Sequence, residues 1–462
     1  MSHSVSLPDP FCRMIESQLG SEAAAAAALF ESLQSEPPVS VRYNPYKLRE
    51  GAERWGTEQE VVPWCRDGRY LASRPQFTLD PLFHAGAYYV QEAASMFLEQ
   101  IFRSVFGRQR EALRVLDLCA APGGKTTLFS TLVGTKGVVV ANEVIRSRAA
   151  ILADNVRRWG IGNTVVTSND PAHFSAFHHV FDAVVVDAPC SGEGMFRKDP
   201  ASRSEWSEQN VKLCAARQRR ILEDVWDALR PEGILVYSTC TFNRFEDEEN
   251  VAWLCERYDC TPVEIAVDPQ WGVVCGEVQG IPTFRFFPGR TKSEGFFVAV
   301  LRKEGAGKEK MPQARKKVFS ALRRNAEQEV ARWIDGSGDK SFAAIDKTVY
   351  IYDREQFSFI RQISECMNVI YSGVPAGQFF GADFKPDSAL ALFYGVSKDR
   401  VAVVDLPLEP ALDYLRKQSV DPQLFEEGLN LVCYEGMPLG WIKRIGNRCN
   451  NLYPKESRIF QL

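Results

Sequence analysis

The stretch Val115-Leu-Asp-Leu-Cys-Ala-Ala-Pro-Gly-Gly-Lys-Thr-Thr127 decides the fold of this chain. Its apolar start, which closes on Asp117, is typical of a buried strand. The Pro-Gly-Gly that follows predicts a tight turn, and the amphipathic residues after it predict a helix. Strand, turn and helix start together predict the first half of a βαβ unit. Because glycines let a ligand approach the backbone and helix N-termini expose free N–H groups, we expect this loop to bind a ligand.

The spacing of the glycines narrows the choice of ligand. The stretch has neither the Gly-x-x-x-x-Gly-Lys-Ser/Thr spacing of a P-loop nor the Gly-x-Gly-x-x-Gly spacing of a dinucleotide site. About twenty residues later, Val138-Val-Val-Ala-Asn-Glu143 predicts a second strand that ends in an acid, which can hold ribose hydroxyls. A nucleoside-type cofactor without a pyrophosphate fits this pattern best, and S-adenosylmethionine is the leading candidate. The alternative is an ordinary strand–turn–helix without a ligand.

The bulk properties are those of an ordinary globular protein. The 462 residues suggest about three domains, and the chain is 45% hydrophobic and 25% charged. It has no run of eighteen apolar residues and no visible signal peptide. Twelve cysteines in a chain of this length, without an export signal, suggest reduced thiols in the cytoplasm. The chain has no Cys-x-x-Cys pair and its five histidines have no ligand spacing, which argues against a zinc site. The net charge is only −4, but nine Lys/Arg face two Glu over residues 302–324. Basic clusters with aromatic neighbours leave RNA binding open against an ordinary solvated face.

Four regions follow from the pattern along the chain. Residues 1–95 mix helix and strand, with helical spacing over residues 10–33, and predict an N-terminal α/β appendage. Residues 96–302 alternate strand and helix, which predicts a doubly wound sheet with residues 296–301 as an antiparallel edge strand. Residues 303–378 are predicted to form a basic linker and an intermediate segment. Residues 379–462 are expected to form a domain of short strands, one of them over residues 389–393.

Two cysteines follow two predicted strands of this sheet. Asp187-Ala-Pro-Cys190-Ser-Gly192 follows the fourth strand, and Ser238-Thr-Cys240-Thr241 follows the fifth. Because adjacent parallel strands lie about 5 Å apart, both thiols and the carboxylate are expected to face the cofactor cleft.

This set of side chains suits methylation of a pyrimidine at carbon 5. A thiolate that adds to carbon 6 makes carbon 5 an enamine nucleophile, which can attack a sulfonium methyl group. An acid near ring N3 stabilises the adduct, a role for Asp187, and a base must later remove the carbon-5 proton. The spacing does not say which cysteine attacks.

With Tyr89-Val-Gln-Glu-Ala-Ala-Ser95, these motifs resemble those of the Sun-domain RNA cytosine-5 methyltransferases, over about residues 1–302. The closing Pro438-Leu-Gly-Trp441 and Asn451-Leu-Tyr-Pro454 resemble the PUA-like C-terminus of the bacterial 16S ribosomal RNA methyltransferase F family. The resemblance implies an α/β protein with a doubly wound, Rossmann-like S-adenosylmethionine-dependent methyltransferase domain. It further implies an N-terminal α/β RNA-binding appendage and a PUA-like RNA-binding domain over residues 379–462.

The resemblance also implies roles for individual residues. Cys240 would be the nucleophile and Cys190 would assist product release, with Asp187 and Lys125 near the target base. The implied cofactor residues are Cys119, Ala120, Ala121, Pro122, Gly123, Gly124, Lys125, Glu143, Asp170 and Asp187. DNA cytosine methyltransferases use the Pro-Cys cysteine, which here would make Cys190 the nucleophile, but the Thr-Cys motif argues against that arrangement.

We therefore expect a cytoplasmic, monomeric RNA methyltransferase that acts on a cytosine of 16S ribosomal RNA, alone or within the small subunit. No membrane and no metal are expected as partners. The same chemistry on transfer RNA and a non-catalytic ribosome-assembly factor are the alternatives. Intact Cys190, Cys240 and Asp187 disfavour the second, and the catalytic motifs do not separate ribosomal from transfer RNA.

Overall fold

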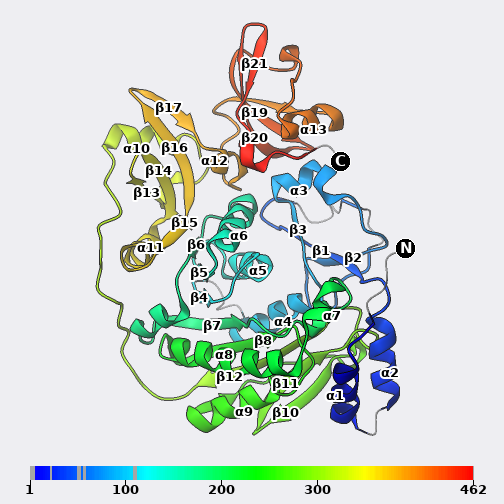
Figure 1. The fold of residues 1–462 in the computed structure, drawn as a ribbon. Helices are drawn as coiled ribbons and strands as arrows, with labels where there is room; N and C mark the ends of the chain where they lie inside the picture. The colour runs from blue at the N-terminus through cyan, green and yellow to red at the C-terminus, as the bar shows by residue number, and fades with distance from the viewer. Residues whose placement is uncertain (1–5, 21–22, 49–53, 56–58, 108–111, 461–462) are drawn as a thin grey trace.

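The computed structural model describes residues 6–20, 23–48, 54–55, 59–107 and 112–460 (Figure 1). Its centre is a sheet in the order β10-β11-β12-β8-β7-β4-β5-β6-β15, with β9 paired to β12. The parallel strands are β4 (Arg114–Asp117), β5 (Val138–Asn142), β6 (Thr164–Thr167), β7 (Phe181–Asp187) and β8 (Leu229–Thr239). Chain order reverses between β4 and β7, which is where doubly wound sheets bind their ligands.

Antiparallel strands extend this sheet at both ends. β12 (Phe296–Lys303) pairs with β8, and β11 (Ile281–Phe286) and β10 (Val274–Val278) follow beyond it, while β9 (Cys260–Pro262) pairs with the end of β12. At the other end, β15 (Val369–Ser372) pairs with β6. The antiparallel direction expected for residues 296–301 is confirmed, but their edge position is wrong, because two further strands cover them.

Helices cover both faces of the sheet. On β4, Val115 packs toward α4 (Phe97–Phe106), α5 (Gly124–Val133) and α6 (Arg146–Trp159). The next residue, Leu116, packs toward α8 (Glu208–Trp226), α9 (Glu248–Arg257) and α11 (Arg354–Cys366). Since successive strand side chains point to opposite faces, both faces need apolar residues, and the central strands are apolar throughout. Polar groups are therefore confined to the strand ends.

The N-terminal region contains two helices and a small sheet. β1 (Val39–Tyr43) lies between β2 (Gly68–Leu71) and β3 (Tyr88–Val90), and α3 (Pro81–Ala85) precedes β3. The helical spacing over residues 10–33 is confirmed. It belongs to two helices, α1 (Asp9–Leu19) and α2 (Ala23–Ser32), because Gly20 takes a positive φ of 53° and ends α1. The two residues after Gly20 lie outside the described residues.

The C-terminal part contains two four-stranded sheets. Residues 304–323 form a long connection without a helix, which Figure 1 shows running from β12 to α10 (Arg324–Ala331). The first sheet contains β13 (Lys340–Ile345), β14 (Thr348–Asp353), β16 (Val374–Phe380) and β17 (Asp383–Pro386). The second contains β18 (Ala402–Asp405), β19 (Gly428–Tyr434), β20 (Met437–Ile445) and β21 (Arg448–Asn451), with α13 (Leu408–Arg416) between β18 and β19.

The strand expected over residues 389–393 is wrong, because the segment forms α12 (Ser388–Leu392). The Asp387 carboxylate accepts a hydrogen bond from the Ala389 amide at 2.8 Å and caps this helix. The second C-terminal sheet shares a hydrophobic core with the N-terminal region, in which Val41 and Tyr88 cluster with Leu412. The small N-terminal sheet and the second C-terminal sheet are therefore packed directly against each other. Among the described residues, no helix is both long and apolar enough to cross a membrane.

Candidate active site

The glycine loop lies between the end of β4 and the start of α5. Gly123 has a φ of 114°, a conformation that side chains disfavour, so glycine is required at this turn. The side-chain amide of Asn155 on α6 donates to the Pro122 carbonyl at 2.8 Å. The turn at Gly123 and the hydrogen bond from Asn155 together fix the backbone of the loop.

This loop borders a cleft of about 360 Å³ at the carboxyl ends of β4, β7 and β8. Eight of the residues singled out in the sequence line it: Cys119, Ala120, Ala121, Pro122, Gly124, Lys125, Asp187 and Cys240. Gly123, Glu143, Asp170 and Cys190 are not part of this lining. Residues of β3 and of the turn after it, including Tyr89 and Gln91, form the opposite wall.

Asp117 lines the same cleft and was not recognised as a site residue from the sequence. Its side chain is fully buried, and its Oδ2 accepts a hydrogen bond from the Thr126 hydroxyl at 2.6 Å. Its Oδ1 has no hydrogen-bond partner among the described residues. Burial raises the pKa of Asp117 to about 7. An unsatisfied carboxylate oxygen beside a glycine loop fits a cofactor that carries positive charge, such as S-adenosylmethionine.

Glu143 and Asp170 lie at the ends of the next two strands, as their spacing predicts. Glu143 directly follows β5 and is buried; its Oε1 accepts from the Ile145 amide at 2.9 Å, and Oε2 lies 3.4 Å from Arg148. Asp170 is exposed after β6 and accepts from the Ala172 amide at 3.0 Å. Both carboxylates therefore stand at the sheet edge that carries the glycine loop, outside the lining of the cleft.

Lys125 and Asp187 form an ion pair inside the cleft. The Lys125 ammonium donates to Asp187 Oδ2 at 2.7 Å, and the Ser238 hydroxyl donates to Oδ1 at 2.8 Å. Burial opposes the charge of Lys125, but the carboxylate outweighs it, so the pKa of Lys125 is raised. The pair holds a hydrogen-bond donor and an acceptor next to each other, at the end of β7 and the start of α5.

The structure brings the two cysteines together. Asp187 of β7 lies opposite Ser238 of β8 in the parallel register, so the loops after these strands are neighbours. The Sγ atoms of Cys190 and Cys240 are 3.2 Å apart, and either thiol can donate to the other. The hydrogen bond with Cys240 and burial both raise the pKa of Cys190, so Cys190 retains its proton and can donate it to Cys240.

A buried carboxylate, which the sequence did not reveal, connects the two cysteine loops. Glu193 follows Cys190 closely in sequence and is fully buried. One of its oxygens accepts from the Thr241 hydroxyl at 2.6 Å and the Phe242 amide at 2.7 Å. The other accepts from Asn243 at 2.9 Å. Residues directly after Cys240 are thus fixed to a residue of the Cys190 loop.

Glu246 forms a second connection between these loops. It is fully buried, and it accepts from the Ser191 amide at 3.0 Å and from Asn243 at 2.7 Å. Burial raises the pKa of Glu246. Glu193, Glu246 and Asn243 therefore link the loop that carries Cys190 to the loop that carries Cys240.

Three family models match the chain. Residues 107–302 match the 16S rRNA methyltransferase RsmB/F model, residues 7–93 the N-terminal domain of 16S rRNA methyltransferase RsmF, and residues 401–459 the methyltransferase RsmF PUA domain. These matches confirm the predictions of a methyltransferase, of its Rossmann-like fold and of a C-terminal PUA domain.

Curated relatives match nearly the whole chain. The ribosomal RNA small subunit methyltransferase F of Cronobacter sakazakii is 31% identical, with 98% of this chain and 96% of that protein covered. The protein of the same name from Erwinia tasmaniensis is 34% identical, with 86% and 84% covered.

Solved structures share the fold over part of the chain. A methyltransferase homologue from Pyrococcus horikoshii is 26% identical with a TM-score of 0.52, covering 64% of this chain and 100% of that chain. NSun6 from the same organism, solved with SFG, is 19% identical with a TM-score of 0.53, covering 65% and 99%. By its full-length curated relatives, the chain belongs to the ribosomal RNA small subunit methyltransferase F family.

Proposed function

We propose that this protein transfers a methyl group from S-adenosylmethionine to carbon 5 of a cytosine in 16S ribosomal RNA, through a covalent bond between Cys240 and the base. The observation that carries the proposal is the pair of thiols at two adjacent strand ends, 3.2 Å apart. Cys240 opens into the cleft that the glycine loop also lines. The names of the full-length relatives support small-subunit ribosomal RNA as the substrate.

The residues around the loop suit S-adenosylmethionine, which would supply an electrophilic methyl group. The backbone of residues 119–125 would hold the cofactor, and Glu143 and Asp170 stand at the strand ends suited to ribose and adenine. Asp117 would pair with positive charge through its free Oδ1. The cofactor site and the base site would then meet at Lys125, which ends the glycine loop and contacts Asp187.

On the RNA side, Cys240 attacks carbon 6 of the cytosine and pushes electron density onto ring N3. The Lys125 ammonium donates a hydrogen bond to Asp187 within the cleft, and this pair stands where it can stabilise N3 at that moment. Carbon 5 then bonds to the methyl group, whose bond to the sulfonium sulfur would break. A base, for which a water molecule in the cleft would serve, takes the carbon-5 proton, and the Cys240 sulfur leaves as thiolate while the carbon 5–carbon 6 double bond re-forms. The Cys190 thiol lies 3.2 Å from that sulfur, where it can assist departure.

The proposal is tested with purified protein, radiolabelled S-adenosylmethionine and three substrates: unmodified small subunits, free 16S ribosomal RNA and transfer RNA. We expect 5-methylcytosine in 16S ribosomal RNA, located by nuclease digestion and mass spectrometry. Methylation of transfer RNA alone would replace the substrate assignment. Methylation at another atom of the base would overturn the chemistry.

Cofactor affinity should depend on pH through Asp117. If its carboxylate pairs with positive charge on the cofactor, affinity should be constant above about pH 8 and fall by up to tenfold per unit below pH 7, because a proton must then leave Asp117. Asp117→Asn should bind about tenfold more weakly and show no such dependence. Titration calorimetry from pH 5.5 to 8.5 measures both. A wild-type affinity that stays flat over this range would contradict the role.

Glu143→Ala should weaken S-adenosylmethionine binding by about 1–3 kcal/mol, because a ribose would lose its charge-assisted hydrogen bonds. The control is Glu143→Gln, which retains an acceptor for the Ile145 amide and preserves the local turn. This variant should lose part of the affinity and none of the stability. Unchanged calorimetric affinity in both variants would exclude the ribose role.

A further inference from the structure

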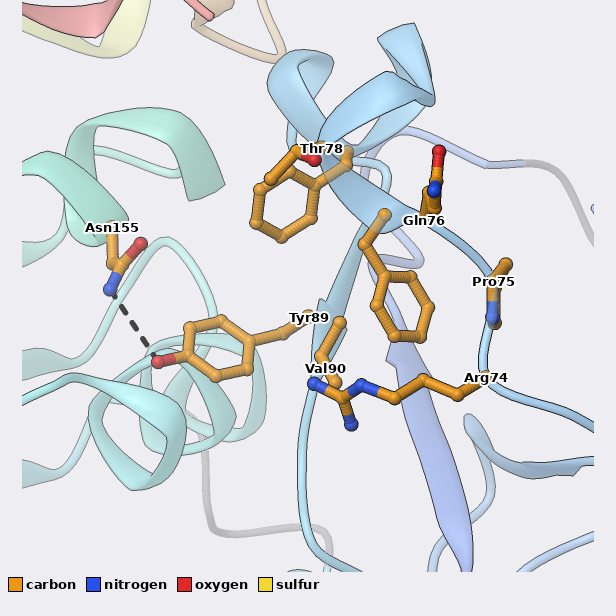
Figure 2. A pocket seen from close by; sticks show the side chains of 9 residues that line it. Arg74, Pro75, Gln76, Thr78, Tyr89, Val90 and Asn155 are labelled. Atoms are coloured by element: carbon orange, nitrogen blue, oxygen red, sulfur yellow. Dashed lines mark hydrogen bonds between the residues drawn. The ribbon is translucent and has the colours of Figure 1, made fainter. Parts of the chain in front are cut away.

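A second cavity, of about 560 Å³, lies between the N-terminal region and α6 and has no part in the chemistry described above. Its aromatic lining consists of Phe77, Phe83 and Tyr89. Figure 2 shows the Tyr89 side chain extending from β3 toward Asn155 of α6, and Arg74 reaching across the pocket from the segment that carries Pro75 and Gln76. The volume is within the range of about 300–1,000 Å³ that suits a small planar group.

This pocket adjoins the catalytic cleft. Tyr89 and Val90 line both spaces. Asn155 donates to the Tyr89 hydroxyl at 3.5 Å and to the Pro122 carbonyl of the glycine loop at 2.8 Å. Tyr89 is thus a shared wall, and one extended ligand can occupy both spaces.

The lining combines ring faces with positive charge. Phe83 and Tyr89 are only half-buried, so part of each ring is accessible. The Arg158 guanidinium lies over the Phe83 ring at 4.8 Å, and Arg74 lies over Phe77 at 5.5 Å. Arg74 is exposed and, among the residues that the structure describes, forms no ion pair, which leaves its charge available to a phosphate. Aromatic platforms beside arginines are the pattern by which proteins bind unpaired nucleotides.

We propose that this pocket receives an unpaired base of the RNA strand, close in sequence to the cytosine at Cys240, while Arg74 contacts a backbone phosphate. The inference rests on the proposed function, because it takes the ligand of the neighbouring cleft to be RNA. A strand that enters the cleft with its cytosine turned out of the stack must place its next bases nearby. The shared wall at Tyr89 makes the aromatic pocket the adjoining space of suitable size and chemistry.

The test combines an abasic scan of the RNA with a variant of the pocket. Oligonucleotides that span the mapped cytosine carry one abasic residue at each flanking position in turn. For the wild-type chain, one position should raise KM and Kd about tenfold and leave kcat unchanged, because a single stacked base is lost. Phe83→Leu should raise KM and Kd for intact RNA similarly, and the abasic residue at that position should cost this variant little more.

Two further variants serve as a control for the pocket and as a test of the phosphate contact. Phe30→Leu replaces a half-buried phenylalanine of α2, outside the pocket, and should respond to the abasic scan as the wild-type chain does. Arg74→Gln changes an exposed side chain, and should reduce the slope of log Kd against log salt by about one unit. S-adenosylmethionine affinity should be unchanged in all three variants.

The outcomes separate this inference from the proposed function. Methylation of the mapped cytosine at an atom other than carbon 5 would refute the proposed chemistry, and the Kd scan on the same oligonucleotides would still test the pocket. Two results would overturn the pocket assignment even with full wild-type methylation. One is that Phe83→Leu and the abasic residue at every position raise KM and Kd independently, so that their effects multiply. The other is an unchanged KM and Kd for Phe83→Leu.

Discussion

Replacing Cys240 by alanine should reduce methyl transfer by at least about 10⁴-fold and leave no covalent protein–RNA adduct. The reason is chemical: without a thiolate on carbon 6, carbon 5 of cytosine is too poor a nucleophile to take a methyl group. S-adenosylmethionine binding should be preserved. The matched control is Cys275→Ala, which removes an exposed thiol of β10 and should retain full activity.

Cys190→Ala should behave differently. Attack and methyl transfer remain possible through Cys240, but the methylated adduct loses the thiol that lies 3.2 Å from the departing sulfur. A covalent protein–RNA band should then accumulate on a denaturing gel and disappear in the double variant. The reverse pattern, with the adduct retained when Cys240 is lost, would assign the nucleophile to Cys190 and leave the fold and cofactor site unaffected.

The parts of the fold that the sequence predicted best are those with strong local periodicity. β4 (Arg114–Asp117) and β5 (Val138–Asn142) lie where the apolar runs before the glycine loop and before Glu143 predicted strands. The buried strands are recognisable because both of their faces are covered, so they are apolar throughout. A five-residue apolar run such as residues 389–393 is too short to distinguish a buried strand from a buried helix. The segment that forms α12 was predicted as a strand for that reason.

Tertiary context decided the position of β12. Its antiparallel direction was predicted, but the two strands beyond it have weak sequence signals. β10 contains an exposed Cys-Gly-Glu and no alternation of apolar and polar residues. Such a strand depends on its neighbour β11 rather than on its own pattern.

The residues of the candidate site also fall into those that the sequence could predict and those that it could not. Residues that follow strands, such as Asp187, Cys190 and Cys240, could be found because strand ends are visible in sequence and meet at one edge of the sheet. Asp117 was read only as the last residue of a strand, since nothing local shows that one of its oxygens lacks a partner. Glu193 was missed because most of its hydrogen-bond donors lie about fifty residues later, after β8.

That buried carboxylate is expected to have the second-largest effect on turnover. Glu193→Gln keeps the size of the side chain but places an amide where hydrogen-bond donors converge from Thr241, Phe242 and Asn243. We expect a loss of about 3 kcal/mol in the free energy of unfolding. Because a displacement of about 1 Å at reacting groups costs roughly 10²-fold, kcat should fall by that factor as the Cys240 loop separates from the Cys190 loop.

A matched control distinguishes positioning from general destabilisation. Glu99→Gln also alters a buried carboxylate, one that accepts from the Cys65 thiol at 3.0 Å on the N-terminal side of the molecule, away from both cysteine loops. It should lower stability similarly and leave kcat intact at temperatures where the protein is folded. For Glu193→Gln, S-adenosylmethionine affinity should persist while formation of the Cys240 adduct slows. Equal kcat values for the two variants would show that Glu193 only stabilises the fold and does not set the position of the nucleophile.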